Sequence, residues 1–334
     1  MPIFLAALIA LIFVQSALAQ LAQGQPAASL ADGRVGAIEF LTPTPRGPSD
    51  LVNRNPAMPQ ATISGALTLP SGAGRVPAVV IAHGSGGILP GREHDWAARL
   101  NALGYATFVL DSFSGRGLRS TGTDQTRLST MANVADALVA LKLLAGHPRI
   151  DPQRIAVMGF SRGGQVALYT ALEPVRQGLI DGELRFAAHV ALYPSCNIPY
   201  RADAVSPAPL LMLLGAADDY TPAPPCFAYA EWFAAQGARI DAKAYDGAYH
   251  DFDISEPPRR YPRLQSARNC RAEVEVGKGT MRRLDTGEEM ADQSVINAYL
   301  KACMEYGATY GGDATALAAA QRDVADFLRR AFGR

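Results

Sequence analysis

Short runs of consecutive apolar residues alternate along this chain with segments in which apolar residues recur every three or four positions. A continuous apolar run of four to eight residues is typical of a strand buried on both faces, and the second spacing is typical of a helix with one buried side. Residues 61–69 instead alternate apolar and polar side chains, which predicts an antiparallel strand at a sheet edge. The predicted strands are 36–41, 61–69, 76–82, 106–110, 155–160, 186–193, 209–214 and 239–245.

Helical spacing occupies most of the segments between these strands. Gly104 is the residue expected to end the first helix, and Asp313 is expected to cap the start of the last one. Strands that alternate with helices form right-handed βαβ units, so the pattern predicts an α/β fold with a mostly parallel central sheet flanked by helices. The predicted helices are 96–103, 128–144, the segment directly after 161, 227–236 and 314–332.

Residues 254–312 break this alternation. The stretch is polar, contains Cys270 and Cys303, and is too long for an ordinary loop. We interpret it as an insertion near the functional site that is stapled by its own disulfide, with partial disorder as the alternative. Residues 35–334 are therefore expected to form a single α/β domain that carries one insertion.

The composition supports a large folded core. Hydrophobic residues make up 49% of the 334 positions, which argues against gross disorder. The formal net charge is zero and no long basic block occurs. This balance argues against nucleic acid or an anionic membrane surface as the main partner.

Residues 1–19 form an apolar segment that ends in Ala17-Leu18-Ala19, the pattern of a secretory signal peptide and its cleavage site. The segment has no Lys or Arg, and the alternative is an uncleaved membrane anchor, although the apolar run is short for a span. We expect cleavage, export to the periplasm or the extracellular space, and no stable membrane partner afterwards. Residues 20–34, rich in Ala, Gly, Gln and Pro, are expected to form a flexible leader.

Export changes the meaning of the four cysteines, because disulfides persist in an oxidising compartment. Cys196 and Cys226 each follow a strand, and the two strands are expected to be neighbours in the sheet, so we predict that these cysteines pair. Cys270 and Cys303 would then form the second disulfide. No C-x-x-C pair and no H-E-x-x-H motif occurs, so a zinc site is not supported and no metal or organic cofactor is expected.

The candidate chemistry centres on the sequence Gly159-Phe-Ser161-Arg-Gly163, between an apolar run and a helical segment. A strand, a sharp turn with Gly-x-Ser-x-Gly and a helix are the parts of a nucleophile elbow. The serine of such an elbow has a strained backbone that raises its hydroxyl above the sheet, and the glycines let strand and helix approach closely. Ser161 is therefore the candidate nucleophile.

A serine hydroxyl needs a base, and the base is usually a histidine oriented by a carboxylate. When the chain order is serine, acid, histidine, only His250 lies beyond the acid candidates. Asp218 and Asp219 end an apolar strand; we predict Asp218 as the acid and keep Asp219 in reserve, expecting it to cap the next turn or face solvent. The other histidines are expected to have no catalytic role: His83 bonded within its loop, His94 at the surface, His147 in a turn and His189 in the core.

Acyl transfer also needs donors for the negative oxygen that develops in the transition state. The backbone N–H groups of Arg162 and Ser85 are the candidates for this oxyanion hole. Asp111 and Arg116 follow another strand and could contact a carboxylate of the substrate, because arginine binds carboxylates through two hydrogen bonds. The alternative, which we favour, is an internal ion pair that ties this loop to the elbow.

These motifs together resemble the dienelactone hydrolase family of the α/β-hydrolases. The resemblance covers residues 60–253 and the last helix, and rests on His83-Gly-Ser-Gly-Gly87, Asp111-Ser-Phe, Gly159-Phe-Ser-Arg-Gly-Gly164, Gly215-Ala-Ala-Asp218 and His250-Asp-Phe. It implies Ser161 as nucleophile, Asp218 as acid and His250 as base. The enzymes that give the family its name use a cysteine nucleophile, so the serine here favours a general esterase over dienelactone hydrolysis.

The expected function is therefore that of an exported serine hydrolase that cleaves small-molecule carboxylic esters through an acyl-enzyme. A peptidase or amidase of the prolyl-oligopeptidase-like type is one alternative, because Gly-x-Ser-x-Gly-Gly also occurs there, although the chain lacks the length for a propeller domain. The other alternative is a non-catalytic binding module on a hydrolase scaffold, because a fold alone does not establish a function.

Overall fold

The computed structural model describes residues 25–333, so the predicted signal peptide, residues 1–19, lies outside the described residues. The elements of the main domain follow the predicted alternation of strands and helices closely. In chain order they are β1 Gly36–Pro43, α2 Pro48–Val52, β2 Gln60–Thr68, β3 Val76–Ala82, α3 Glu93–Ala102, β4 Ala106–Asp111, η1 Ser114–Arg116, η2 Gln125–Arg127, α4 Thr130–Ala145, β5 Ile150–Phe160, α5 Arg162–Tyr169, α6 Glu173–Gln177, β6 Ala188–Leu192, β8 Leu210–Gly215, α7 Ala223–Ala235, β9 Ile240–Tyr245 and α9 Ala314–Ala331.

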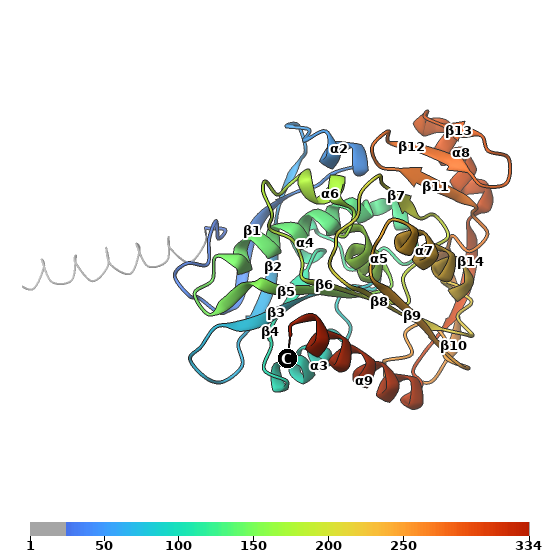
Figure 1. The fold of residues 1–334 in the computed structure, drawn as a ribbon. Coiled ribbons are helices and arrows are strands. Elements are labelled where there is room, and N and C mark those ends of the chain that lie inside the picture. The colour runs from blue at the N-terminus through green and yellow to red at the C-terminus, as the bar shows by residue number, and fades with distance from the viewer. Residues whose placement is uncertain (1–24, 334) are drawn as a thin grey trace, which may run out of the picture.

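An eight-stranded sheet in the order β1-β2-β4-β3-β5-β6-β8-β9 forms the centre of the molecule (Figure 1). Neighbouring strands run parallel from β4 to the far edge of the sheet, in the spatial order β4, β3, β5, β6, β8 and β9. Strand β2 pairs antiparallel with both β1 and β4. This is the predicted α/β fold with a mostly parallel sheet. One detail differs, because β1 forms the edge and β2 lies one strand inside it.

Helices cover both faces of this sheet, which explains why its central strands are continuous apolar runs. In β3, Ala78 and Val80 belong to the hydrophobic cluster on the side of α4, α5 and α7. Val79 and Ile81 point to the other face, into the cluster with α3 and α9. Successive side chains of a strand alternate between its faces, so every position of β3 meets a hydrophobic layer.

The ends of two helices are formed as the sequence predicts. Gly104, directly after the C-cap of α3, has a φ of 87°, a conformation that a glycine adopts without strain. The Asp313 side chain accepts hydrogen bonds from the backbone N–H groups of Thr315 and Ala316 at the start of α9. These bonds satisfy two of the donors that a helix start leaves unpaired.

Residues 25–34, which composition alone suggested to be a flexible leader, lie against the domain. Leu30 is fully buried in the cluster on the α4 side, and the Ala27 N–H donates to the Glu39 carbonyl at 2.6 Å. One buried leucine and one backbone hydrogen bond thus attach this segment beside β1.

The insertion over residues 254–312 has its own secondary structure and a small core of Ala272, Val274, Met281, Met290 and Ile296. One of its strands pairs in parallel with a two-residue strand of the main domain, β7 Tyr200–Arg201, so the insertion is joined to the body by backbone hydrogen bonds. Its elements are β10 Arg259–Ser266, β11 Ala272–Glu275, β12 Thr280–Arg283, β13 Glu289–Met290, α8 Gln293–Cys303 and β14 Glu305–Tyr310.

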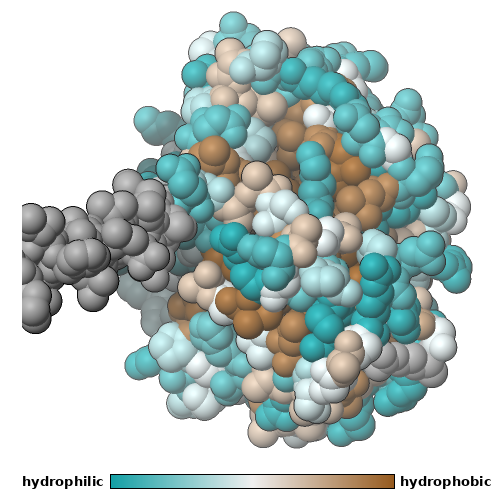
Figure 2. All heavy atoms as spheres, turned by 90° about the vertical axis from the view of Figure 1, so that its left-hand side faces the viewer, coloured by the Kyte–Doolittle hydropathy of each residue, from teal (hydrophilic) through white to brown (hydrophobic). Residues whose placement is uncertain are grey.

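The molecular surface is mostly polar on the face shown in Figure 2, where hydrophobic residues come to the surface in patches bordered by hydrophilic ones. Within residues 25–333, no helix has both the length and the apolar composition needed to cross a membrane.

Candidate active site

Ser161 occupies the sharp turn between β5 and α5. Its backbone has φ 53° and ψ −110°, a strained conformation for a residue with a side chain. A Cβ atom at Gly159 would collide with the backbone of Gly163, and one at Gly163 would collide with the carbonyl oxygens of Ala82 and His83. Only glycine permits this close approach of strand and helix, which is the geometry expected of a nucleophile elbow.

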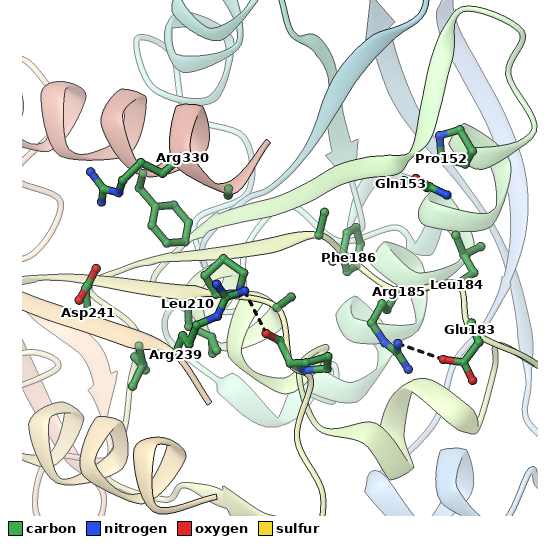
Figure 3. Close-up of a pocket in the computed structure, with 17 residues that line it drawn as sticks. Pro152, Gln153, Glu183, Leu184, Arg185, Phe186, Leu210, Arg239, Asp241 and Arg330 are labelled. Carbon is green, nitrogen blue, oxygen red and sulfur yellow. Dashed lines mark hydrogen bonds and ion pairs between the residues drawn. The ribbon is translucent and has the colours of Figure 1, made fainter. Parts of the chain in front are cut away.

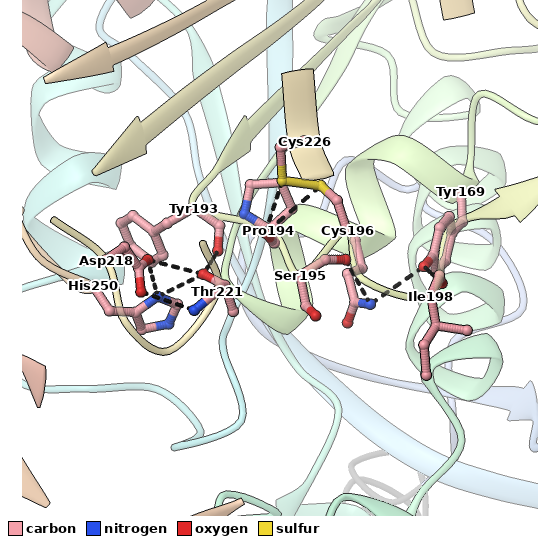
Figure 4. Close-up of a disulfide and its surroundings, with 11 residues drawn as sticks. Tyr169, Tyr193, Pro194, Ser195, Cys196, Ile198, Asp218, Thr221, Cys226 and His250 are labelled. Carbon is pink, nitrogen blue, oxygen red and sulfur yellow. Dashed lines mark hydrogen bonds and ion pairs between the residues drawn. A yellow bond between two sulfur atoms is a disulfide. The ribbon is translucent and has the colours of Figure 1, made fainter. Parts of the chain in front are cut away.

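Asp218 and His250 are buried and joined by a short hydrogen bond. His250 Nδ1 lies 2.7 Å from Asp218 Oδ2 and 2.9 Å from Thr221 Oγ1 (Figure 4). Burial lowers the pKa of His250, but the Asp218 carboxylate outweighs this effect, so the pKa lies above its usual value. The hydrogen bond leaves Nε2 as the nitrogen able to accept a proton in the neutral ring.

Asp218 itself also caps the turn that follows it, which corrects the role expected for Asp219. Asp218 Oδ1 accepts from the backbone N–H groups of Tyr220 and Thr221, each at 2.8 Å. Asp219 points the other way, and its Oδ1 accepts from the Thr309 N–H of β14 at 2.6 Å. Asp219 therefore ties the insertion to this loop and does not approach His250.

Two tyrosine rings flank the imidazole of His250 edge-on. The centroids of the Tyr193 and Tyr220 rings each lie 4.7 Å from that of His250. Among the described residues, neither Ser161 Oγ nor His250 Nε2 makes a hydrogen bond. Catalytic hydrogen bonds are often long in a ligand-free enzyme and tighten in the substrate complex.

The two candidate oxyanion donors lie beside the elbow. Within the part of the chain that the structure describes, the backbone N–H groups of Ser85 and Arg162 donate to no other group. Gln125, which belongs to none of the predicted motifs, links the two residues: its Oε1 accepts from Ser85 Oγ at 3.0 Å and from Arg162 Nη2 at 2.8 Å.

Arg116 forms an internal ion pair, as the favoured interpretation expected, but its partner lies on α4 and not in the elbow. Arg116 forms two hydrogen bonds, of 2.7 and 2.8 Å, with the fully buried carboxylate of Asp136 on α4. Asp111 Oδ1 accepts from the N–H groups of Phe113 and Ser114 and so caps η1. Among the described residues, no hydrogen bond or ion pair joins the Asp111 or Arg116 side chain to the elbow, residues 159–163.

The remaining histidines have the structural roles predicted for them. His83 Nδ1 lies 2.8 Å from the Gly84 carbonyl, and its Nε2 accepts from the Ser112 N–H at 3.2 Å. His189 is buried in β6, and burial lowers its pKa to about 4. His147 Nδ1 accepts from the Arg149 N–H in its turn, and His94 is exposed.

A second polar cluster, built around Arg92, lies behind His250. The Arg92 guanidinium, 1% exposed, pairs with Glu93 at 2.7 Å and with Asp251 at 2.9 Å. Asp253 accepts from Tyr193 Oη at 2.5 Å and from Trp96 Nε1 at 2.7 Å. Burial raises the pKa of Asp253 to about 6. Through these ion pairs and hydrogen bonds, the segment that carries His250 is bound to α3 and to the loop after β6.

A pocket of about 660 Å³ opens at the elbow. Ser161, Arg162 and Ser85 line it on the side of the main domain, and the insertion supplies an opposite wall. The lining residues of the insertion are Gln265, Ser266, Ala267, Met281, Gln293, Asn297, Leu300 and Met304. Residues 254–312 are thus placed near the site, as expected.

Another cavity, of about 850 Å³, is lined by the residues drawn in Figure 3, and none of the candidate catalytic residues is among them. Its lining includes Phe186, Leu210 and Ile240 at the amino ends of β6, β8 and β9, whereas Ser161 lies at the carboxyl end of β5. Ligands of open parallel sheets bind at the carboxyl ends of the strands, so the pocket at Ser161 is the candidate active site.

Both predicted disulfides are present. Cys196–Cys226 joins the loop after β6 to the first turn of α7, close to the loops that carry Asp218 and Thr221 (Figure 4). Cys270–Cys303 joins the start of β11 to the end of α8 inside the insertion. In residues 25–333, no group of three or more His, Cys, Asp or Glu side chains is arranged to hold a metal ion.

Comparison with known proteins adds a family and a fold. The model of the dienelactone hydrolase family matches residues 63–276. An uncharacterised protein of Mycobacterium tuberculosis is 29% identical over 162 residues, 45% of this chain and 55% of that protein. The quorum-quenching protein AidA of Acinetobacter baumannii is 32% identical over 111 residues, 33% of this chain and 36% of AidA. The chain therefore spans about half the length of the first relative and about a third of the second.

Among solved structures, a dienelactone hydrolase-like promiscuous phosphotriesterase from metagenomic libraries superposes with a TM-score of 0.55 and 16% identity, covering 88% of this chain and 98% of that one. Esterase 2 of Thermogutta terrifontis has a TM-score of 0.47 and 21% identity, over 57% of this chain and 81% of the esterase. At these identities the first likeness shows the α/β-hydrolase fold alone, and the second carries no further argument.

Proposed function

This chain belongs to the dienelactone hydrolase family, and from that premise we propose that it is a hydrolase that cleaves carboxylic esters with Ser161, His250 and Asp218. The observation that carries the proposal is the buried 2.7 Å hydrogen bond between His250 and Asp218, in a molecule whose Ser161 lies in a strained elbow at the pocket. A base held in one tautomer and a hydroxyl that faces the substrate pocket are the two parts that a serine nucleophile needs.

The proposed reaction has two halves. Ser161 Oγ attacks the ester carbonyl carbon while its proton passes to His250 Nε2, and the carbonyl oxygen becomes an oxyanion held by the N–H groups of Ser85 and Arg162. The C–O bond to the alcohol then breaks, and the alcohol takes the proton from His250. In the second half, water gives a proton to His250 and its oxygen attacks the acyl carbon. The bond between that carbon and Ser161 Oγ then breaks, the carboxylic acid leaves, and Ser161 Oγ takes the proton from His250.

Hydrolysis of p-nitrophenyl acetate and butyrate by the mature protein tests this proposal. Ser161→Ala and His250→Ala are expected to lower kcat by roughly 10⁴–10⁶-fold, as removal of a triad member does in other serine hydrolases. Labelling of Ser161 by a fluorophosphonate tests the nucleophile without requiring turnover. Absence of both turnover and labelling would point to a non-catalytic binding module, and faster turnover of peptide anilides would point to an amidase.

The pocket favours esters larger than acetate. Its volume of about 660 Å³ is within the range of drug-sized ligand sites, and Met281, Leu300 and Met304 of the insertion give it apolar surface. We expect kcat/KM to rise along a series of p-nitrophenyl esters from acetate to longer acyl chains. A steady fall along that series would exclude a bulky acyl group as the occupant of this pocket.

Export of the protein also remains a proposal. The two disulfides support it, because structural disulfides persist in oxidising compartments. Amino-terminal sequencing of the protein from the host's periplasm or medium is expected to begin at Gln20. A protein that starts at Met1 and remains in the membrane fraction would instead indicate an uncleaved anchor.

A further inference from the structure

The Arg162 side chain is buried next to the candidate nucleophile and has no carboxylate partner among the described residues. It is 4% exposed. Its guanidinium donates to the Gln125 carbonyl at 3.0 Å, to Gln125 Oε1 at 2.8 Å and to the Leu128 carbonyl at 2.9 Å. The side-chain oxygen of Asn133 accepts a further bond at 3.3 Å. All of these acceptors are neutral.

The titratable groups that face Arg162 do not supply a negative charge either. They are Tyr169, Tyr200 and Tyr220. Burial raises the pKa of Tyr200 and of Tyr220 to about 12 and that of Tyr169 well above its usual value, so all three are neutral near pH 7. Burial lowers the pKa of Arg162 to about 10, which still leaves the guanidinium positively charged. The positive charge is therefore uncompensated.

A buried charge without a counter-ion is costly, and proteins rarely retain one. Arg162 is also the residue whose backbone N–H is the candidate oxyanion donor. Gln125 Oε1 accepts from both the Arg162 guanidinium and Ser85 Oγ, so a single amide oxygen joins the side chains of the two donor residues. The cation is thus held close to the position where a negative charge would appear.

We propose that the Arg162 guanidinium stabilises the oxyanion electrostatically, and that Gln125 is a positioning residue that holds it against Ser85 without neutralising it. The inference rests on the proposed esterase function. An interaction that is strong only when the oxyanion forms lowers the barrier of the chemical step and not the energy of the bound substrate. A neutral amide suits this purpose, because a carboxylate at the same place would neutralise the cation before the reaction begins.

The insertion contacts Gln125 and so supports its position beside Arg162 and Ser85. The backbone N–H of Gln125 donates to Gln265 Oε1 at 2.9 Å, and the Gln265 N–H donates to the Gly122 carbonyl at 3.0 Å. Gln265 lies in β10, at the start of the insertion, so residues 254–312 contact the proposed oxyanion site through Gln125.

The substitution Gln125→Glu tests the charge directly. Glutamate has nearly the shape of glutamine and can accept the same bonds from Ser85 and Arg162, but it supplies the missing counter-charge. We expect kcat for a p-nitrophenyl ester to fall roughly 10- to 100-fold with KM changed less than about three-fold, and Tm to stay the same or rise. A purely structural role would predict a normal kcat in this variant.

Gln165→Glu is the matched control. Gln165 lines the same pocket, and its Nε2 donates to Tyr169 Oη and to the Ser195 carbonyl. Its replacement therefore adds the same charge without a hydrogen bond to Arg162, and also removes these two donated bonds. A clearly smaller loss of kcat than in Gln125→Glu is expected. Equal losses in the two variants would overturn the specific role of Gln125.

Arg162→Lys and Arg162→Met form a second pair that does not depend on the folding of Gln125→Glu. Lysine retains the positive charge and methionine removes it at similar length. We expect the lysine variant to keep at least about ten-fold more kcat than the methionine variant, at comparable KM. Equal kcat values would overturn the role of the charge, whereas a wild type that neither turns over esters nor labels at Ser161 would overturn the proposed function itself.

Discussion

Two buried arginines flank the candidate triad, and their surroundings are opposite. Arg92, behind His250, pairs with the carboxylates of Glu93 and Asp251. Arg162, beside Ser161, is bound by neutral oxygens alone within residues 25–333. A buried charge that is paired with an opposite charge can hold two segments together in any part of a protein. An uncompensated one is stable only at a cost, and becomes favourable where a negative charge forms during a reaction.

The Arg92 cluster holds together the segments around the candidate triad. Asp251 has a φ of 55°, and its ion pair with Arg92 holds the backbone directly after His250 in this strained conformation. Arg92 also lies 4.9 Å from the centre of the Phe160 ring, next to the nucleophile. Arg92 therefore contacts the segments that carry both proposed catalytic side chains, while its own charge is neutralised.

The largest effect that separates the two regions is expected in stability. Arg92→Met would leave the Glu93 and Asp251 carboxylates without their cation, and breaking a buried pair in this way costs about 3–5 kcal/mol of unfolding free energy. Arg162→Met leaves unpaired carbonyls but no orphaned charge, so a loss of about 1–3 kcal/mol is expected. Urea unfolding of both variants measures the difference; equal losses would mean that compensation by carboxylates does not distinguish the two sites.

Removal of the Cys270–Cys303 disulfide is expected to have a smaller effect on stability, confined to the insertion that contacts Arg162 through Gln125. This cross-link closes a loop of the insertion, and such bonds typically contribute 2–4 kcal/mol to stability. In Cys270→Ser/Cys303→Ser, amide hydrogen exchange is expected to accelerate within residues 272–303 and to stay unchanged in α3, which carries Arg92. Faster exchange in both regions would show that the insertion and the Arg92 cluster unfold as one unit.

The pH dependence of kcat/KM also distinguishes the Arg92 cluster from Arg162. Asp218 and Asp251 raise the pKa of His250, and Arg92 lowers it. His250 must be neutral to accept a proton, so kcat/KM of the wild type is expected to fall as pH drops through a pKa above 6.5. Asp251→Asn removes a negative charge and should move this acid limb to lower pH by less than about one unit. Arg162→Lys keeps the positive charge and should leave the pH of the acid limb unchanged. A shift of equal size in Arg162→Lys would mean that the Arg162 region affects His250 as strongly as the Arg92 cluster does.

The smallest effect is expected at Arg116, a second compensated arginine. Arg116 is paired with Asp136 and does not line the pocket at Ser161. In Arg116→Lys, the ratio of kcat/KM values for an anionic and a neutral ester should therefore change by less than about two-fold. A selective loss of activity on the anionic ester would restore Arg116 as a substrate contact.

Local patterns were enough to predict most of the main domain. The apolar runs that became β3 and β8, the elbow at Ser161 and the cap at Asp313 each depend on a few consecutive residues, and consecutive residues are visible in a sequence. Chain order restricted the base to His250. The strands of the insertion were not predicted, because β11 and β12 have four residues each, too few for a pattern of apolar and polar side chains to distinguish a strand from a loop.

Contacts between distant segments could not be predicted in the same way. The bond of Gln125 to Arg162 spans 37 positions and that of Arg92 to Asp251 spans 159, and neither pair belongs to a motif. The ion pair of Arg116 with Asp136 could not be found for the same reason, because Asp136 lies on the buried side of a helix whose sequence indicates only packing.

Short motifs and the order of residues along the chain specify the kind of chemistry available: a serine in a strained turn, a histidine and a carboxylate in the required order, and four cysteines that form two disulfides. The tertiary structure alone decided which charges are neutralised, since that depends on the groups that the fold brings within hydrogen-bond distance. Arginine has the same charge at 92 and at 162. Only the packing of the surrounding segments gives two carboxylates to the first and none to the second.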